Sequence, residues 1–247
     1  MNDMKQFTAL LVAACVGMLS AEATLIRPVS VTSTIVGDAG SHVDYLIGDN
    51  GGFGEAGLQR PVGNAVTLNT GASLADAQAT FAALSGAAHA ESWTANVTAG
   101  NPVFVFDLGA DTSIGTVVLW QYGNNGGPGS DNSGNMTKNF SLIFHTESDG
   151  SGIDFGSESI DFTDTMALIT GETTADNIAQ TFQFPSVTAR YVGLRIDDNY
   201  GPDTANVADG GRFGLGEVRF ATESLVPEPM SIGLLALGGL LLLVRRR

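Results

Sequence analysis

Ala189-Arg190-Tyr191-Val192-Gly193-Leu194 is the first of two short stretches that decide the fold, and Gly214-Leu215-Gly216-Glu217-Val218-Arg219-Phe220 is the second. Both contain β-branched and aromatic side chains, and Val192 and Leu194 in the first and Val218 and Phe220 in the second are spaced two residues apart, as on one face of a β-strand. The residues between the two stretches are rich in glycine, aspartate and asparagine, which favour turns. The two stretches therefore predict a pair of β-strands close to the end of a β-rich domain.

The same pattern extends back along the chain. Phenylalanine and leucine alternate with other residues in 102–108 and again in 138–146. Further strands are predicted at 29–36, 64–68, 114–122, 180–184, 190–196 and 212–221. Only residues 73–84 have the spacing of an amphipathic helix. Several short strands joined by glycine-rich loops predict an all-β fold, built as an antiparallel β-sandwich.

In order and spacing, these segments resemble the discoidin-like, or galactose-binding-like, jelly roll of the F5/8 type C and carbohydrate-binding-module families. The two closing stretches carry the most specific part of the resemblance, and Phe104-Val105-Phe106-Asp107-Leu108-Gly109 and Phe140-Ser141-Leu142-Ile143-Phe144 add to it. The resemblance implies a discoidin-like jelly-roll β-sandwich over residues 24–225. The chain departs from those families in lacking the cysteine pair that often joins their termini, since its one cysteine is Cys15.

Two apolar segments flank this domain. Residues 1–23 contain Lys5, an apolar run and Ala21-Glu22-Ala23, which together predict a signal helix that signal peptidase removes after Ala23. Residues 226–247 contain Pro227-Glu228-Pro229, an uncharged apolar run, and Arg245-Arg246-Arg247. The apolar run covers about 22 Å as a helix, which is short for a hydrocarbon core of about 30 Å.

This tail resembles the PEP-CTERM sorting signal of Gram-negative bacteria. The resemblance implies a short transmembrane helix that serves as a transient membrane anchor, with an exosortase-type enzyme as the processing partner. It also implies export through the inner membrane and delivery to the cell surface or the extracellular matrix. An ordinary C-terminal anchor helix is the other interpretation. We therefore expect a signal peptide at 1–23, one domain at 24–225 and a sorting signal at 226–247.

The chain is acidic, with 26 acidic and 11 basic residues and a formal net charge of −15. Three of the basic residues are the terminal arginines, so the domain itself is no less acidic than the whole chain. Such a charge disfavours nucleic acid and anionic lipid surfaces as partners. Divalent cations and neutral polymers suit it better.

A carbohydrate site is predicted where the strand that contains Trp120 runs into a glycine- and asparagine-rich loop. Trp120 and Tyr122 would stack on the apolar face of a pyranose, and Asn124 and Asn125 would hydrogen-bond its hydroxyl groups. A competing interpretation places Trp120 in the core, where it would continue the face that begins at Ile114.

The discoidin-like resemblance also implies a structural calcium ion near one end of the sandwich. Glu217 matches the glutamate of the last strand in those families, and Asp49 is the candidate carboxylate of the early loop, with Asn50 beside it. Calcium takes six to eight oxygens, so these side chains together with main-chain carbonyls would be chemically adequate. In the alternative interpretation, Glu217 only ends a strand and Asp49 only shapes a turn.

No arrangement of residues predicts catalysis. The three histidines, His42, His89 and His145, lack metal-binding spacing, and no nucleophile elbow or nucleotide-binding loop stands in a suitable context. We expect a non-catalytic binding protein for extracellular or envelope polysaccharide, in an exopolysaccharide or biofilm setting. A structural matrix component without specific glycan binding is the alternative, and a hydrolase with an unrecognised carboxylate pair is a third.

Overall fold

The computed structural model describes residues 22–37, 42–48, 58–59, 68–82, 93–122, 133–169, 177–201 and 211–222. Thr24–Glu223 form one compact unit, and every described strand and helix lies within it. The predicted sorting signal at 226–247 and nearly all of the predicted signal peptide lie outside the described residues. None of the helices in the described part of the chain has the length and apolar character needed to cross a membrane.

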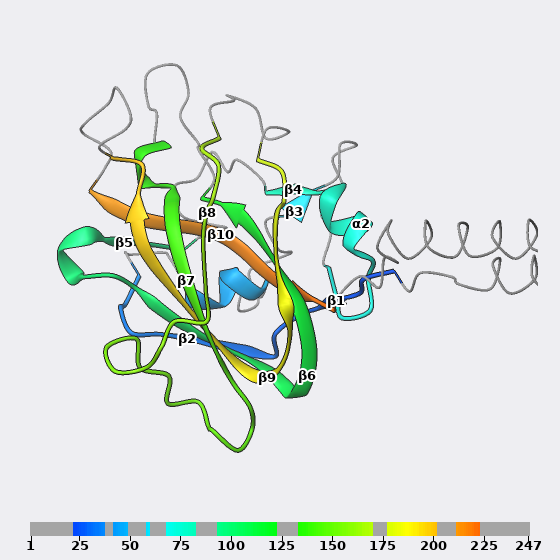
Figure 1. Cartoon of the computed structure of the whole chain (residues 1–247). Coiled ribbons are helices and arrows are strands. Elements are labelled where there is room, and N and C mark those ends of the chain that lie inside the picture. Colours follow the sequence, from blue (N-terminus) through cyan, green and yellow to red (C-terminus); the bar gives the residue numbers. More distant parts are fainter. Residues whose placement is uncertain are drawn as a thin grey trace, which may run out of the picture. The chain divides into compact units, whose positions relative to one another are not determined.

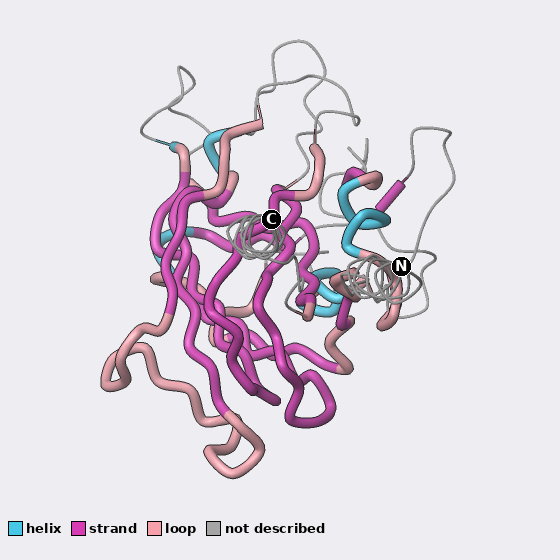
Figure 2. The backbone as a smooth tube through the Cα atoms, turned by 45° about the vertical axis from the view of Figure 1, so that its right-hand side comes forward, coloured by secondary structure: helices cyan, strands magenta, loops and turns pink. Residues whose placement is uncertain are grey.

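The described residues form ten strands and four short helices (Figure 1). The strands are β1 Leu25–Ile26, β2 Ser30–Ser33, β3 Leu58–Gln59, β4 Phe81–Ala82, β5 Trp93–Asn96, β6 Val103–Gln121, β7 Thr137–His145, β8 Phe162–Thr165, β9 Gln180–Asn199 and β10 Arg212–Ala221. The helices are η1 Val43–Ile47, α2 Leu74–Gln78, η2 Val97–Ala99 and η3 Ser133–Asn135. Strands thus dominate the described residues, as Figure 2 shows.

All pairings between these strands are antiparallel. The main sheet has the order β1-β10-β6-β9-β7-β8, with β2 also pairing with β6 and β5 also pairing with β10. Strands β3 and β4 form a separate two-stranded sheet. The predicted all-β antiparallel architecture is confirmed.

Two long strands, β6 and β9, give the sheet its two layers. They pair along most of their length, but the register shifts between Asp107 and Thr112 and again between Ile114 and Thr116. Near the first shift Gly109 has a φ of 89°, a backbone conformation that suits glycine. Both strands bend in this region, near the bottom of the view in Figure 1. We call residues 109–112 and 187–189 the bend end of the sandwich.

The halves of β6 and β9 on either side of the bend belong to different layers. One layer contains β2, the first half of β6, the second half of β9, β7 and β8. The other contains the second half of β6, the first half of β9, β10, β5 and β1. The sequence predicted separate strands in each half, and the structure joins them into continuous strands. The result is a sandwich whose layers share two strands.

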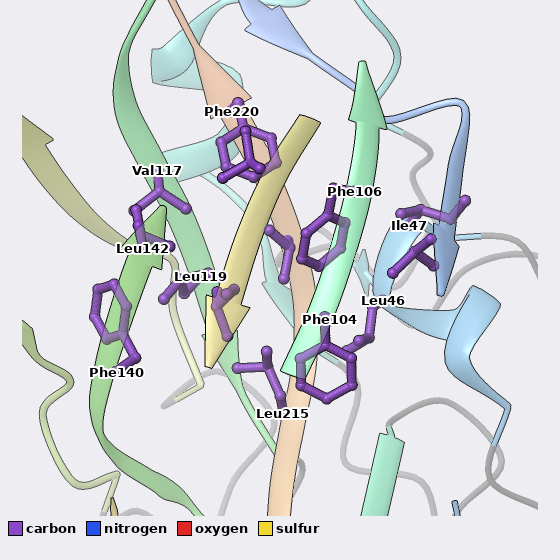
Figure 3. Close-up of a cluster of buried hydrophobic side chains, with 14 of the residues drawn as sticks. Leu46, Ile47, Phe104, Phe106, Val117, Leu119, Phe140, Leu142, Leu215 and Phe220 are labelled. Carbon is purple, nitrogen blue, oxygen red and sulfur yellow. The ribbon is translucent and has the colours of Figure 1, made fainter. Parts of the chain in front are cut away.

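The main core fills the space between the layers. Figure 3 shows apolar side chains from both layers and from η1 turned toward one another. All are buried: Leu46, Ile47, Phe104, Phe106, Val117, Leu119, Phe140, Leu142, Leu215 and Phe220. In the layer that contains β10 and the second half of β6, alternate residues of these two strands face the main core. Their remaining side chains therefore lie on the outer face of that layer.

A second apolar cluster covers that outer face. It contains Val118 and Trp120 of β6, together with Leu68 and Ala77 from the segment that carries α2. The helix begins with a capping box, in which the Ser73 hydroxyl accepts a hydrogen bond from the Asp76 amide at 3.0 Å. The helix predicted at 73–84 is therefore present but shorter, because Phe81–Ala82 pair as β4 with β3.

Candidate functional site

Trp120 lies in this second cluster and is fully buried, with 0% of its surface exposed. The face predicted to run from Ile114 through Trp120 is broken, because the register shift after Ile114 turns Ile114 into the main core and leaves Trp120 on the opposite side of the layer. A ring covered by α2 and its flanking segment cannot stack on a sugar. The predicted ligand role of Trp120 is therefore wrong. Trp120 is buried, as the competing interpretation had it, but in the second cluster with Val118 and not on the face of Ile114.

Tyr122 follows the end of β6 and is 3% exposed, so its ring is not offered as a stacking surface either. It forms a third apolar cluster with Met136 and Ile169, and the half-buried ring of Tyr200 packs against that cluster. The Tyr200 hydroxyl donates a hydrogen bond to the Met166 carbonyl at 2.5 Å. Tyr122 thus anchors one end of the sandwich from within instead of contacting ligand directly.

Buried amide side chains join the strand ends around this third cluster. Gln121 Nε2 donates to the Thr137 carbonyl at 2.7 Å, which ties the end of β6 to the start of β7. Asn177 Nδ2 donates to the Gln121 carbonyl at 2.9 Å, and Asn177 is fully buried. Each amide pairs with a backbone group, so these side chains hold the backbone of the chain segments that meet here.

Two further asparagines extend this arrangement to β9 and β10. Asn199 Nδ2 donates to the Arg212 carbonyl at 2.7 Å, and the Arg212 amide donates to Asn135 Oδ1 at 3.1 Å. The Tyr200 amide in turn donates to the Met136 carbonyl at 3.2 Å. We call this region the loop end, defined by Gln121, Tyr122, Asn135, Met136, Ile169, Asn177, Asn199, Tyr200 and Arg212.

Three stretches of chain begin and finish at the loop end. Residues 123–132 connect Tyr122 to η3, residues 170–176 connect Ile169 to Asn177, and residues 202–210 connect the end of β9 to the start of β10. Asn124 and Asn125, predicted to bind ligand, fall in the first stretch and lie outside the described residues. The amides of the loop end were missed from the sequence, because nothing in the local pattern marks them as buried.

Glu217, the predicted calcium ligand of the last strand, is buried and lies against an arginine. Its carboxylate forms an ion pair with the guanidinium of Arg219, two residues farther along β10, and that guanidinium is fully buried. Burial raises the pKa of Glu217 to about 7, and the positive charges of Arg219 and Arg27 work against this rise. The expected metal ligand therefore already has a positively charged partner from the protein itself.

The other predicted metal ligands, Asp49 and Asn50, lie outside the described residues. The carbonyls of Ile47 and Gly48, directly before them, accept hydrogen bonds from Arg27 at 2.8 and 3.1 Å. Within the described ranges, no cluster of three or more histidine, cysteine, aspartate or glutamate side chains could hold a metal ion. In the described part of the predicted site, the candidate oxygens of Glu217, Ile47 and Gly48 thus lie against arginine side chains.

His145, at the end of β7, is the described histidine with a carboxylate partner. Its Nε2 lies 2.5 Å from Glu158 Oε2, and its Nδ1 lies 2.9 Å from the Gly150 carbonyl. Burial lowers the pKa of His145, but the hydrogen bonds to Glu158 and to the Gly150 carbonyl, together with the negative charges of Glu158 and Asp149, outweigh it, so the pKa is raised above 6.5. Because both ring nitrogens are bound by the loop that follows β7, this histidine holds the loop and offers no free nitrogen as a general base.

No family model matches the chain, and no curated protein matches it. Several solved structures are similar. The CBM32 module of AlyQ, in complex with 4,5-unsaturated mannuronic acid, is 16% identical, with 79% of this chain and 96% of that chain covered and a TM-score of 0.41. The family 32 module of C. perfringens NanJ, in complex with galactose, is 11% identical, with 81% and 98% covered and a TM-score of 0.43.

The lectin domain of lectinolysin, in complex with Lewis B antigen, is 14% identical, with 79% of this chain and 93% of that chain covered and a TM-score of 0.42. A truncated AlyQ that also carries an alginate lyase domain is 18% identical over 83% of this chain, with a TM-score of 0.43, and the chain spans only 34% of that protein's length. The sugar in each of the three complexes is the ligand of that protein.

Proposed function

We propose that the protein is an exported, surface-sorted, non-catalytic protein that binds extracellular or envelope polysaccharide at the loop end of the sandwich. The observation that carries this proposal is that the described residues at the ends of three connecting stretches are held together by one framework of buried amides and aromatic rings. Loops that are positioned by a rigid scaffold are where binding residues concentrate. The bend end, by contrast, is closed by the continuous strands β6 and β9.

The chemistry of the loop end suits a neutral polyhydroxylated ligand. Asn124 and Asn125 would donate to and accept from sugar hydroxyls, as amides do. Since Trp120 and Tyr122 are buried, we assign the aromatic contact to the half-buried Tyr200, over whose ring Lys138 lies at 5.8 Å from the centroid. The net charge of −15 favours a neutral polymer over a polyanion.

The carboxylates of β9 near the loop end support a non-catalytic role. Asp197 accepts a hydrogen bond from Arg195 Nε at 2.5 Å and another from the Ser141 hydroxyl at 2.5 Å. Asp198 lies 3.8 Å from the Lys138 ammonium group. Glycoside hydrolysis requires two carboxylates directed at one bond, whereas these two are engaged by neighbouring side chains.

A broad glycan array probed with the purified protein tests this function. We expect binding to one class of glycan. The double variant Asn124→Ala/Asn125→Ala should then weaken affinity about tenfold or more, since each lost hydrogen bond is worth about 1 kcal/mol. Thr188→Ala, an exposed position at the bend end, is the matched control and should leave affinity unchanged. A flat array would contradict glycan binding and favour the structural matrix role.

Export and sorting have their own test. Mass spectrometry of protein recovered from the surface of a strain with active exosortase should show a chain that begins after Ala23 and lacks the segment with Arg245, Arg246 and Arg247. An intact C-terminal tail on the recovered protein would contradict processing and leave the ordinary anchor interpretation.

A further inference from the structure

The outer face of β10 holds a group of charges that the proposed function does not use. Glu217 and Arg219 point to this face, because Val218 and Phe220, which alternate with them, face the main core. The two side chains form a buried ion pair. On the neighbouring strand β6, Trp120 is the register partner of Glu217 and Val118 is the register partner of Arg219. The pair is thus built into the layer that α2 and its flanking segment cover.

Arg219 also ties β10 to the chain before α2. Its Nε donates to the Leu68 carbonyl at 2.8 Å, and its Nη1 donates to the Val218 carbonyl at 2.7 Å. Its Nη2 faces the Glu217 carboxylate in the ion pair, so each of the three nitrogens of the guanidinium lies against an oxygen. This is the planar, multiply hydrogen-bonded setting that arginine, and not lysine, can satisfy.

Arg27, which follows β1, binds the neighbouring oxygens. Its Nε and Nη2 donate to the carbonyls of Ile47 and Gly48 at the end of η1, and its Nη1 donates to Asn69 Oδ1 at 3.1 Å. The charge of Arg27 also acts on both Glu217 and Arg219. Two guanidinium groups therefore engage a buried carboxylate, four main-chain carbonyls and an amide oxygen from three separate segments of the chain.

These are the kinds of oxygen that a calcium ion would need. Calcium takes six to eight oxygens at about 2.3–2.6 Å, and carboxylates and main-chain carbonyls are its usual ligands. Here the described carboxylate and carbonyls already accept from guanidinium N–H groups. A divalent cation placed among them would meet two positive charges at short range, which is electrostatically unfavourable.

We propose that Arg219 and Arg27 take the place of a structural metal ion in this sandwich. Their guanidinium groups supply the positive charge that joins Glu217 of β10 to the end of η1 and to the segment that leads into α2. The stability of the fold consequently depends on these arginines and not on calcium.

Thermal unfolding at about pH 8, above the ordinary pKa of glutamate, tests the proposal. The Tm of the wild type should be the same in excess EGTA and in millimolar calcium. Arg219→Met leaves a buried carboxylate without its partner and should lower the Tm by roughly 10 °C. The double variant Glu217→Gln/Arg219→Met removes both charges and should recover at least half of that loss. Arg190→Met, which removes an arginine from a surface ion pair with Asp107, is the matched control and should change the Tm far less.

Two results would overturn the proposal. One is a rise of several degrees in the wild-type Tm on adding calcium that Glu217→Gln abolishes. The other is a double variant that is no more stable than Arg219→Met. A calcium response that survives Glu217→Gln would place an ion elsewhere and contradict the independence of the fold from calcium, whereas recovery in the double variant would still support the arginines as the partners of Glu217. Where Arg219→Met does not fold, a folded double variant supports the proposal, and a double variant that also fails to fold counts against it.

Discussion

Ile153 packs directly onto Gly193, so closely that a Cβ atom at residue 193 would lie 2.7 Å from Ile153 Cγ2 and 3.1 Å from Phe155 Cε2. The loop after β7 therefore covers the outer face of β9, and a glycine is what allows it to do so. Gly193→Ala should destabilise the protein by about 1–3 kcal/mol, the usual cost of overpacking. Gly152→Ala, in the same loop with nothing within 4 Å, should change the free energy of unfolding by less than about 0.5 kcal/mol. Urea unfolding measures both, and equal stabilities would contradict this packing.

Gly216 is enclosed even more tightly than Gly193. A Cβ there would lie 2.4 Å from the Gln121 carbonyl oxygen, at the point where the register between β10 and β6 shifts after Leu215. Because the contact is with backbone, no side chain can rotate away, and Gly216→Ala should cost at least about 3 kcal/mol. Gly211→Ala, at the entry to β10 with open space around it, is the control and should be close to neutral in the same urea experiment. A Gly216→Ala variant as stable as the control would show that the register shift does not depend on glycine.

The His145–Glu158 pair should make the stability of the loop after β7 depend on pH. The pKa of His145 is raised above 6.5, so its contribution is complete below about pH 6.5 and is lost as pH rises through its folded-state pKa. The hydrogen bond from His145 lowers the pKa of Glu158 below 4.5, so that contribution is complete above about pH 4.5 and is lost on further acidification. The difference in Tm between wild type and Glu158→Gln should therefore be greatest between about pH 4.5 and about pH 6.5. A difference that stays constant from about pH 4 to about pH 9 would exclude the pair as the cause.

The strands were the most predictable part of the fold. Residues 212–221 were predicted as a strand and form β10, and the strand predicted at 138–146 is β7 at Thr137–His145. In both, apolar residues alternate because one face of each strand packs in the main core. The strand predicted at 29–36 is shorter, as β2 at Ser30–Ser33. The strand predicted at 64–68 lies almost wholly outside the described residues.

It was harder to predict from the local sequence pattern which of the predicted strands would join into one continuous strand. Pro185 lies between the two stretches predicted as separate strands at 180–184 and 190–196, and a proline normally interrupts a strand. In the structure it lies where the β6–β9 register shifts, and β9 continues through it. Tertiary pairing with β6 overrides the local signal. Short strands such as β1 and β8 carry too few residues for any periodicity to show.

The candidate site was less predictable than the fold, because its placement depends on burial. Trp120 lies in a strand as predicted and Tyr122 directly follows that strand, but which face is covered depends on α2 and on the register shift near Ile114. Glu217 was recognised by its position in the closing stretch. Its partner Arg219 stands in the same quoted stretch, yet only the structure shows that both side chains are buried together.

The proposed loop-end site is tested most directly by NMR titration of the nitrogen-15-labelled protein with an oligosaccharide selected on the glycan array. Backbone amide shifts should concentrate at Tyr122, Asn135, Tyr200 and Arg212, while Gly109 and Thr188 at the bend end stay unchanged. Shifts centred on the bend end, or no shifts at a saturating concentration of the oligosaccharide, would contradict a glycan site at the loop end.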